Sequence, residues 1–245
     1  VDMNYTIPQY FIEKNINHFS PSQANMPVDQ WYWKYFVNNQ ETRRKFATSA
    51  KMWGGIYAGN AIEEWVGNGN SILRMLDVPG YKDYVGINEK DQRQHELNTV
   101  KNAYAAYDEI GITKSNKVIF ENYVSGTLED VVLPIIGRTD AQSKNIVIEL
   151  KTKWSMQKSG TKKDGTPFAP SKSKSPNKPD YNHLLQTAFY YNFTKDVKAY
   201  LVYATEQDYK IFDIDDYNPK RLIEQFRLKL LVKQKLASHT DGKEF

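Results

Sequence analysis

The hydrophobic positions follow two different periods, and the change between them divides the chain into a helical part and a strand-rich part. Residues 19–23 have the composition of a loop with a capping serine, and they lead into a dense aromatic run at 31–36. Apolar side chains recur at helical spacing in that run, over about 41–66 and over about 91–109. We therefore expect three helices, the second of them interrupted at its glycines, Gly54, Gly55 and Gly59, and ended by the run Gly67, Asn68, Gly69 and Asn70.

From about residue 118 the period changes to that of strands. Short β-branched runs at 118–120, 131–136 and 146–150 are bounded by turn residues, which is typical of a meander of antiparallel strands. A segment rich in Ser, Gly, Pro and Lys then predicts a long loop within the domain. The elements expected after this loop are a helix over about 182–192, strands over 197–204 and 209–214, and an amphipathic helix that begins with Asn218 as N-cap and Pro219 and ends near residue 236.

This order of elements predicts an α/β fold, with a mixed central sheet flanked by helices and an N-terminal helical portion. A length of 245 residues fits one domain with added helices. We expect a single domain over residues 1–245, made of a mainly helical part (1–110), a sheet core (111–215) with a flexible lysine-rich loop (155–180), and a C-terminal helix (216–245).

Composition limits the chemistry of any site. The chain has 40% hydrophobic and 25% charged residues, as a globular protein does, and it has no cysteine. Disulfides, thiol catalysis, thiolate-bound zinc and cysteine-ligated iron–sulfur clusters are therefore excluded, and the four histidines show no paired spacing that would predict zinc. Oxygen ligands are the remaining way to hold a metal. The sequence shows neither a membrane-spanning stretch nor a secretory signal, so we expect a soluble, cytoplasmic protein with no membrane partner.

The positive charge is concentrated in one segment. The net charge is only +4, but residues 151–178 carry eight lysines against one acid, Asp164. A basic, flexible loop can follow a nucleic-acid backbone and become ordered when it binds, although a solvated surface loop would have the same composition. The basic residues that we expect to contact nucleic acid are Arg138, Lys153, Lys158, Lys162, Lys163, Lys172 and Lys174.

Two acids and a lysine stand on the predicted hairpin between residues 133 and 152. The period of two places Glu149 and Lys151 on one face of their strand and the apolar residues 146, 148 and 150 on the other. If the hairpin is centred between Lys144 and Asn145, then Asp140 lies directly opposite Glu149, with Cβ atoms ~5 Å apart.

Two carboxylates that face each other across a strand pair destabilise the fold unless another charge compensates them. A magnesium or manganese ion would do so, because it binds carboxylates, a backbone carbonyl and water in octahedral geometry. Lys151 could then hold a phosphate oxygen or position the attacking water, which is what hydrolysis of a phosphodiester requires. The alternative is an ordinary surface hairpin that carries Glu and Lys on its solvated face.

The order of these residues resembles a nuclease family. Gly137-Arg138-Thr139-Asp140 followed by Glu149-Leu150-Lys151 is similar to the PD-(D/E)XK nuclease signature, and Gln186 to Tyr190 resembles the Gln-x-x-x-Tyr motif of its RecB-like exonuclease branch. Gln186 and Tyr190 would lie one helical turn apart on the same face. Upstream, the segment 59–63 resembles the helix that supplies a further metal ligand in these nucleases, here Glu63, with Glu64 as the alternative. The aromatic opening at 19–36 is loosely similar to that of the same family, and the mitochondrial genome maintenance exonuclease and its phage-type relatives show the most similar combination of motifs.

The resemblance implies a restriction-endonuclease-like core and a division of roles. Asp140, Glu149, Glu63 and the Leu150 carbonyl would hold one or two Mg²⁺ or Mn²⁺ ions, and Lys151 would orient the attacking water and stabilise charge on the phosphate. Gln186 and Tyr190 would position Lys151, water or a DNA phosphate. The absence of cysteine implies the form without an iron–sulfur cluster, and no small-molecule cofactor is expected.

The function predicted in this way is a metal-dependent DNA exonuclease with a preference for single strands or ends. A restriction-type endonuclease and a nucleic-acid-binding or recombination protein that has lost catalysis are the alternatives. The richness in Asn and Lys is typical of an AT-rich genome, such as that of a phage, and would then place the protein in the host cytoplasm.

Overall fold

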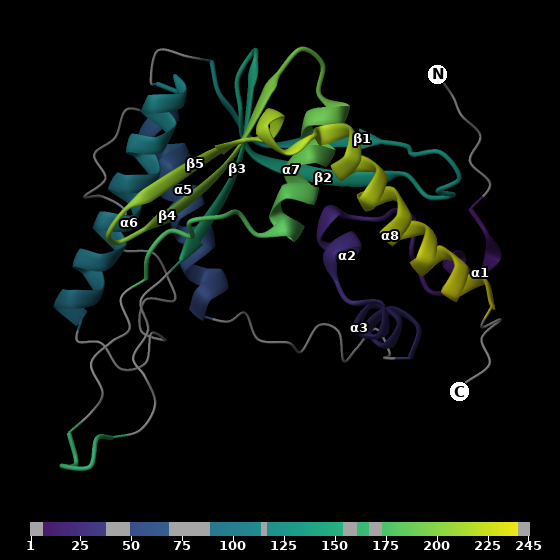
Figure 1. Ribbon diagram of the computed structural model, residues 1–245, viewed down its shortest axis with the longest axis horizontal. Coiled ribbons are helices and arrows are strands. Elements are labelled where there is room, and N and C mark those ends of the chain that lie inside the picture. Colours follow the sequence, from purple (N-terminus) through teal and green to yellow (C-terminus); the bar gives the residue numbers. More distant parts are fainter. Residues whose placement is uncertain are drawn as a thin grey trace.

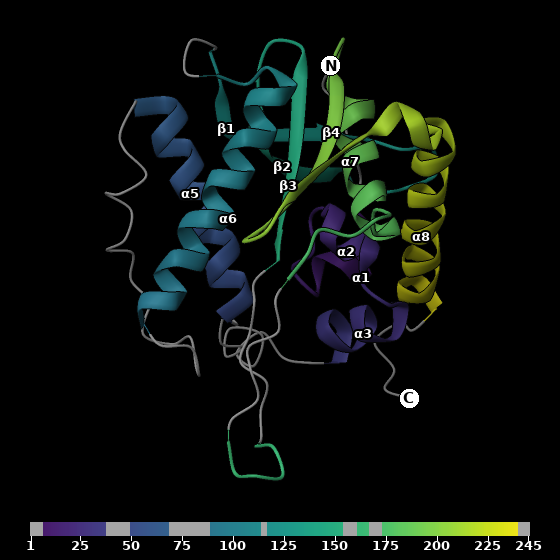
Figure 2. The ribbon, with the colours of Figure 1, turned by 60° about the vertical axis from the view of Figure 1, so that its left-hand side comes forward.

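The protein is built as a layered α/β structure in which helices cover both faces of one sheet. The computed structural model describes residues 7–37, 50–68, 89–113, 117–153, 161–166 and 173–239. Helices α5 (Ala50–Asn68) and α6 (Glu89–Ile110) lie on one side of the sheet, and α7 (Tyr181–Phe193) and α8 (Pro219–His239) lie on the other, together with the N-terminal helices (Figures 1 and 2). The predicted α/β class, with a mixed sheet and an N-terminal helical portion, is confirmed.

The sheet has five strands in the order β1-β2-β3-β4-β5. The first three, β1 (Ile119–Gly126), β2 (Ile135–Gln142) and β3 (Ile146–Lys153), form the antiparallel meander that the sequence predicted. The connection through α7 then makes β4 (Lys198–Thr205) parallel to β3, and β5 (Tyr209–Asp213) pairs antiparallel with β4. Strand β3 is the third of the five and therefore the central strand, with an antiparallel neighbour on one side and a parallel one on the other.

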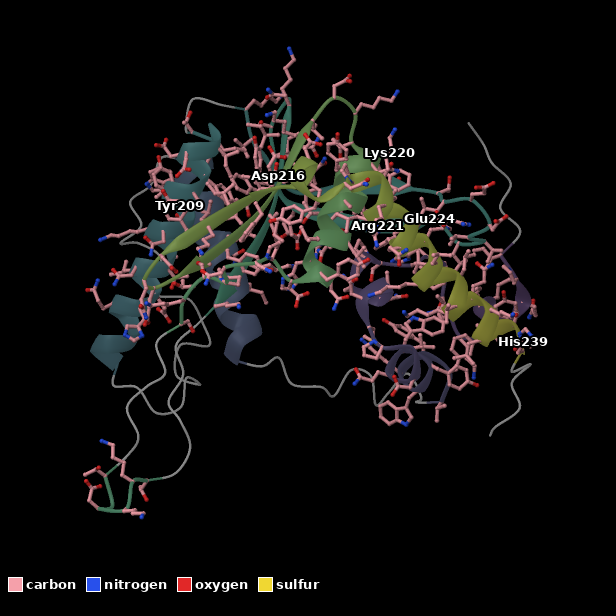
Figure 3. The ribbon with its side chains drawn as sticks, in the orientation of Figure 1. Tyr209, Asp216, Lys220, Arg221, Glu224 and His239 are labelled. Atoms are coloured by element: carbon pink, nitrogen blue, oxygen red, sulfur yellow. The ribbon has the colours of Figure 1, made fainter. Side chains whose placement is uncertain are left out.

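One core lies between the sheet and the pair α5 and α6. Ile62, Val100 and Tyr107 from the helices pack there with Ile148 and Val202 from the strands, all nearly inaccessible to solvent. Tyr209 at the start of β5, labelled in Figure 3, donates a hydrogen bond of 2.8 Å to Glu109 near the end of α6. Helix α5 passes without interruption through Gly54, Gly55 and Gly59, so the predicted break at these glycines is wrong. Glycine weakens a helix by only about 1 kcal/mol, which packing against the sheet offsets.

The second core is aromatic and lies on the opposite face of the sheet. Helices α1 (Gln9–Ile12), α2 (Pro21–Asn25) and α3 (Val28–Tyr32), with a π-helical turn at Trp33–Val37, pack here against α8. The large side chains that they bury with α7 and α8 include Phe11, Phe19, Trp31, Phe189 and Phe226. The aromatic run at 31–36 is therefore mainly core, as aromatic residues of this density usually are.

Several element ends are fixed by capping side chains. Ser20 accepts a hydrogen bond from the Gln23 amide and starts α2, so the predicted loop at 19–23 is partly helical while its capping serine is confirmed. Asp180 caps α7 in the same way. Asn218 accepts from the Arg221 amide at 3.2 Å at the start of α8, as the sequence predicted. Figure 3 shows Lys220, Arg221 and Glu224 along the first turns of α8, where all three are exposed.

Two strand boundaries differ from the prediction. The run 131–136 becomes a strand only from Ile135 onward, because Val131 and Leu133 are buried in a turn that packs against α8. Strand β1 extends to Gly126, well past the predicted end at residue 120. Among the described residues, no helix is long and apolar enough to cross a membrane.

Candidate active site

The candidate site lies where β2 and β3 separate. The two strands pair at Ala141 with Ile148 and at Gln142 with Val147, and the Ser143 amide donates to the Ile146 carbonyl at 2.9 Å. This register centres the hairpin between residues 144 and 145, as predicted, and places Asp140 opposite Glu149. The described pairing of β2 with β3 ends at this point, while β3 stays paired with β4 as far as Lys153.

Asp140 holds the point of separation in place. One more step of the strand pairing would bring Leu150 opposite Thr139, but the Leu150 amide instead donates to Asp140 Oδ2 at 2.5 Å. A carboxylate that accepts from a backbone amide of the neighbouring strand is fixed in position relative to that strand. Asp140 and the main chain of Leu150 are therefore held beside each other, as two ligands of one ion would have to be.

Glu149 and Lys151 follow each other on one face of β3, and that face is covered. The Glu149 side chain is only 2% exposed, and its Oε1 accepts a hydrogen bond from Lys151 Nζ. The other oxygen, Oε2, is buried without a hydrogen-bond partner. A buried carboxylate oxygen without a partner is destabilising, so its position calls for a cation or a proton. The alternative of a solvated surface hairpin does not apply to Glu149.

A short chain of hydrogen bonds connects Lys151 to α7 and back to β2. Gln186 Oε1 accepts from Lys151 Nζ at 3.5 Å, and Gln186 Nε2 donates to the Tyr190 hydroxyl at 3.2 Å. The Tyr190 hydroxyl donates in turn to the Arg138 carbonyl at 2.7 Å. Gly137 allows this approach, because a Cβ atom there would come within 2.8 Å of the Tyr190 ring. The predicted pair on α7 thus lies beside the acids and the lysine.

The charges in this cluster act strongly on one another. Burial, and then the charge of Glu149, raise the pKa of Asp140 well above its ordinary value. Burial also raises the pKa of Glu149, although Lys151 opposes the shift. For Lys151, burial alone would lower the pKa, but the charges of Glu149 and Asp140 outweigh burial and raise it. Burial, with the charge of Glu149 adding to it, raises the pKa of Tyr190, which keeps its hydroxyl protonated as a donor.

Two cavities meet over these side chains. The first, of about 420 Å³, lies on the α7 side and is lined by Asp140, Glu149, Lys151, Gln186 and Tyr190 among others. The second, of about 690 Å³, lies beside α5 and is lined by Gly55, Ile56, Gly59 and Asn60 of that helix. Asp140 and Lys151 line both cavities. A substrate could therefore extend past the acids in either direction.

The segment before α2 and the first residues of α2 form one wall of the first cavity. Phe19 pairs with β2 at Ile135: its amide donates to the Pro134 carbonyl at 2.9 Å, and its carbonyl accepts from the Ile136 amide at 2.8 Å. This pairing places four neighbouring residues in the cavity wall: His18, Ser20, Pro21 and Ser22. The hydroxyls of Ser20 and Ser22 lie 2.9 Å apart.

The sequence prediction missed Glu121 and Tyr123, both of which line the first cavity. Glu121 lies between two β1–β2 pairs, Phe120 with Ala141 and Asn122 with Thr139, and so falls opposite Asp140. Its backbone is left-handed, with φ 49°, which is uncommon for a residue other than glycine. Extending the predicted strand at 118–120 by the alternation in Glu121-Asn122-Tyr123-Val124 would have placed both residues on β1.

The third predicted acid, Glu63, is exposed on α5. Among the described residues, no three His, Asp or Glu side chains are close enough to hold one ion together. Asp140, the buried Glu149 Oε2 and the Leu150 carbonyl nevertheless provide oxygen donors of the type that Mg²⁺ or Mn²⁺ binds, with water or phosphate in the remaining positions. The chemistry of the residues present therefore fits a divalent cation.

The structure brings some of the predicted basic residues to the site and leaves others apart. Arg138 lines both cavities, and its guanidinium is 2.9 Å from Glu121. Lys153 follows Lys151 along β3, and its Nζ lies 5.6 Å from the centre of the Tyr203 ring. The remaining ones are Lys162, Lys163 and Lys174, which are exposed, and Lys158 and Lys172, which fall outside the described residues.

Comparisons with known proteins support the fold. No family model matches the sequence, and no curated protein does. One solved structure, described as a "putative exonuclease" from Eubacterium rectale, matches with a TM-score of 0.54 over 98% of this chain and 86% of that chain, at 13% sequence identity. A second, the protein SSO0001, covers 71% of this chain and 84% of that chain at 20% identity, with a TM-score of only 0.30. At these identities the first match shows a shared fold, and the second carries no argument.

Proposed function

We propose that this protein is a metal-dependent deoxyribonuclease that hydrolyses phosphodiester bonds as an exonuclease. The observation that carries the proposal is the convergence of Asp140, Glu149 and Lys151 at the point where β2 and β3 separate, with one Glu149 oxygen buried and unpartnered. The likeness of the fold to a structure described as an exonuclease supports it. So does the presence of both hairpin acids, Asp140 and Glu149, beside Lys151, because a protein that only binds nucleic acid would not need them.

Asp140, Glu149 and the Leu150 carbonyl would hold magnesium or manganese. The bound ion would supply positive charge to the scissile phosphate and lower the pKa of the attacking water. Lys151, held between Glu149 and Gln186, would donate to a phosphate oxygen and orient the water. The water oxygen would form the new bond to phosphorus and lose a proton to solvent. The ester P–O bond would break, and the leaving oxygen would take up a proton from solvent, which gives a hydroxyl end and a phosphate end.

Gln186 and Tyr190 are positioning residues in this mechanism. Tyr190 joins the carbonyl of Arg138 on β2 to Gln186, and Gln186 contacts the Lys151 ammonium. Together they set the distance between the separated strands and the orientation of Lys151.

A direct test uses end-labelled linear DNA and circular DNA, each with magnesium, with manganese and with EDTA. We expect progressive shortening of linear DNA with either metal, no cleavage in EDTA, and intact circles. Lys151→Met should abolish cleavage while DNA binding is retained. Cleavage of circles would show an endonuclease instead, and binding without cleavage by the wild-type protein would show a binding protein. Equal rates for the wild-type protein and Lys151→Met would overturn the assignment of Lys151.

A further inference from the structure

Tyr123 is the most exposed large hydrophobic side chain described, and it lies next to the candidate site. The ring is 71% exposed although it lines the same cavity as Asp140, Glu149 and Lys151. An aromatic side chain left exposed at the edge of a polar cavity contributes little hydrophobic stabilisation to the free protein. Its position is more consistent with contact to a ligand.

Arg138 is held beside this ring. Tyr123 and Arg138 are direct partners across β1 and β2, and the guanidinium carbon lies 5.9 Å from the ring centre. The guanidinium is also 2.9 Å from a carboxylate oxygen of Glu121. The Arg138 carbonyl is fixed by the Tyr190 hydroxyl, so both ends of the residue have partners. The ring and the guanidinium therefore form a preorganised surface with a flat apolar part and a positive part.

We infer that Tyr123 and Arg138 form a nucleotide subsite, in which the ring stacks on an unpaired base and the guanidinium contacts the adjoining phosphate. Every nucleic-acid base offers a flat face to an aromatic ring, and the phosphate beside it needs a cation. Both parts open into the cavity that holds the acids, so the base belongs to a nucleotide next to the scissile phosphate. This inference rests on the proposed nuclease function and specifies a strand whose base near the cleaved bond is unpaired.

A base in an intact duplex does not offer this contact, because its faces are covered by neighbouring base pairs. The subsite therefore favours single-stranded DNA or a frayed end over the interior of a duplex. It also gives Glu121 a role, since its carboxylate keeps Arg138 beside the ring until a phosphate replaces it.

The test combines protein variants with single-stranded oligonucleotides that each lack one base. For the wild-type protein, removal of the base at one position near the cleaved bond should lower kcat/KM by about 5- to 10-fold, as expected for one exposed base–aromatic stack. Tyr123→Ala should show the same loss on the intact oligonucleotide and no further loss when that base is removed. Tyr123→Phe, which keeps the ring, should behave as the wild-type protein does.

Tyr181→Ala is the matched control. Tyr181 is also an exposed tyrosine, 48% accessible, with the Lys229 ammonium 5.8 Å from its ring, but it is not among the residues that line the cavity. This variant should cleave the intact oligonucleotide at the wild-type rate. Its kcat/KM should fall as much as that of the wild-type protein when the base is removed. If Tyr123→Ala gives the same two results as Tyr181→Ala, the assignment of the subsite is wrong, although the nuclease function stands.

Binding separates failure of the subsite from failure of the nuclease proposal. The fluorescent base 2-aminopurine, placed at the identified position, should be quenched by stacking when it binds the wild-type protein or Tyr123→Phe in EDTA, and should stay bright with Tyr123→Ala. If the wild-type protein cleaves no DNA, the position is found by moving the fluorescent base along the strand. Quenching that does not depend on Tyr123 would overturn the inference.

Discussion

The Leu150 amide donates to the carboxylate of Asp140 where the pairing of β2 with β3 ends. This one contact both separates the strands and places an acid beside the main chain of the neighbouring strand. Next to it, Glu149 has one oxygen on Lys151 and the other buried without a partner. The free protein therefore holds two carboxylates in an environment that raises the pKa of both.

Asp140→Asn should stabilise the protein in EDTA and remove its response to magnesium. The amide oxygen can still accept from Leu150, but the repulsion between Asp140 and Glu149 is gone. We expect the free energy of unfolding in urea to rise by on the order of 1 kcal/mol in EDTA. Magnesium should stabilise only the wild-type protein, through linkage to binding. A decrease in stability in EDTA would show that the two charges do not repel each other in the free protein.

Glu63→Gln should raise the magnesium concentration needed for half-maximal cleavage. Gly55 and Gly59 line the larger cavity, and Glu63 lies one turn after Gly59 on the same face of α5. Glu63 is exposed and stands apart from Asp140 and Glu149 in the free protein, so an effect of this variant would show that the acid approaches them when an ion binds. Glu64→Gln, on the next position of the helix, is the control and should leave the magnesium dependence unchanged. If Glu64→Gln raises the magnesium requirement and Glu63→Gln does not, Glu64 is the metal ligand instead.

Tyr190→Phe should lower kcat by about 10-fold with little change in KM, because the hydroxyl positions Gln186 and therefore Lys151 without contacting the cleaved bond. Single-turnover kinetics measure the two effects separately. Tyr191→Phe is the control, since the Tyr191 side chain interacts with Asp215 instead. An equal loss in both variants would indicate a general effect on α7.

Gly137→Ala should destabilise the fold by about 1–3 kcal/mol, because the new methyl group would meet the Tyr190 ring at 2.8 Å and Pro21 at 2.9 Å. Gly59→Ala should instead stabilise the fold. Among the described residues, no atom outside the local helix backbone and the two neighbouring residues lies within 4 Å of the Cβ position, and alanine favours a helix by about 0.5–1 kcal/mol over glycine. Urea denaturation of both variants tests this contrast. Two destabilised variants would show that α5 packs more tightly at Gly59 than described.

Lys233→Met should stabilise the protein at pH 7 and lose this advantage as the pH rises. Lys233 is 1% exposed, and burial lowers its pKa from 10.5 to about 8 in the folded state. Between these values the unfolded chain binds more protons, so the stability of the wild-type protein rises from pH 8 to 10.5. Loss of the hydrogen bond of 3.1 Å to the Ala24 carbonyl offsets part of the gain.

The unfolding free energies of Lys233→Met and the wild-type protein are compared at pH 7 and at pH 10. Other titrating groups contribute equally to both proteins, so their contribution cancels in the difference between the two. Lys235→Met, a substitution at an exposed position of the same helix, is the control. Its unfolding free energy should differ from that of the wild-type protein by the same amount at both pH values. A constant difference for Lys233→Met as well would mean that its ammonium is solvated in the folded state.

Much of this site could be predicted because it lies in local sequence patterns. The turn residues between β2 and β3 determine the hairpin register, and that register places Asp140 opposite Glu149. Helical spacing places Gln186 and Tyr190 on one face of α7, and both lie beside Lys151. Asp140 and Glu149, and likewise Gln186 and Tyr190, are few residues apart, so local periodicity determines the relation within each pair. The contact of Gln186 with Lys151, 35 residues away, depends on the tertiary structure.

Other features depend on partners distant in the chain. The sequence could not show that the Glu149 face of β3 is covered, because the cover comes from α7 and from the segment before α2. Nor could it show that Glu121 and Tyr123 line the same cavity, since this requires β1 to extend along the whole of β2.

The amino-acid sequence by itself determined the identity and order of the candidate acids, the lysine and the α7 pair, because strand and helix periods assign faces locally. Only the tertiary structure decided which face is buried, where β2 leaves β3, and that the Tyr123 ring stays exposed beside Arg138. Burial turns an ordinary acid such as Glu149 into a group that requires a cation, and burial depends on all the elements that pack around it.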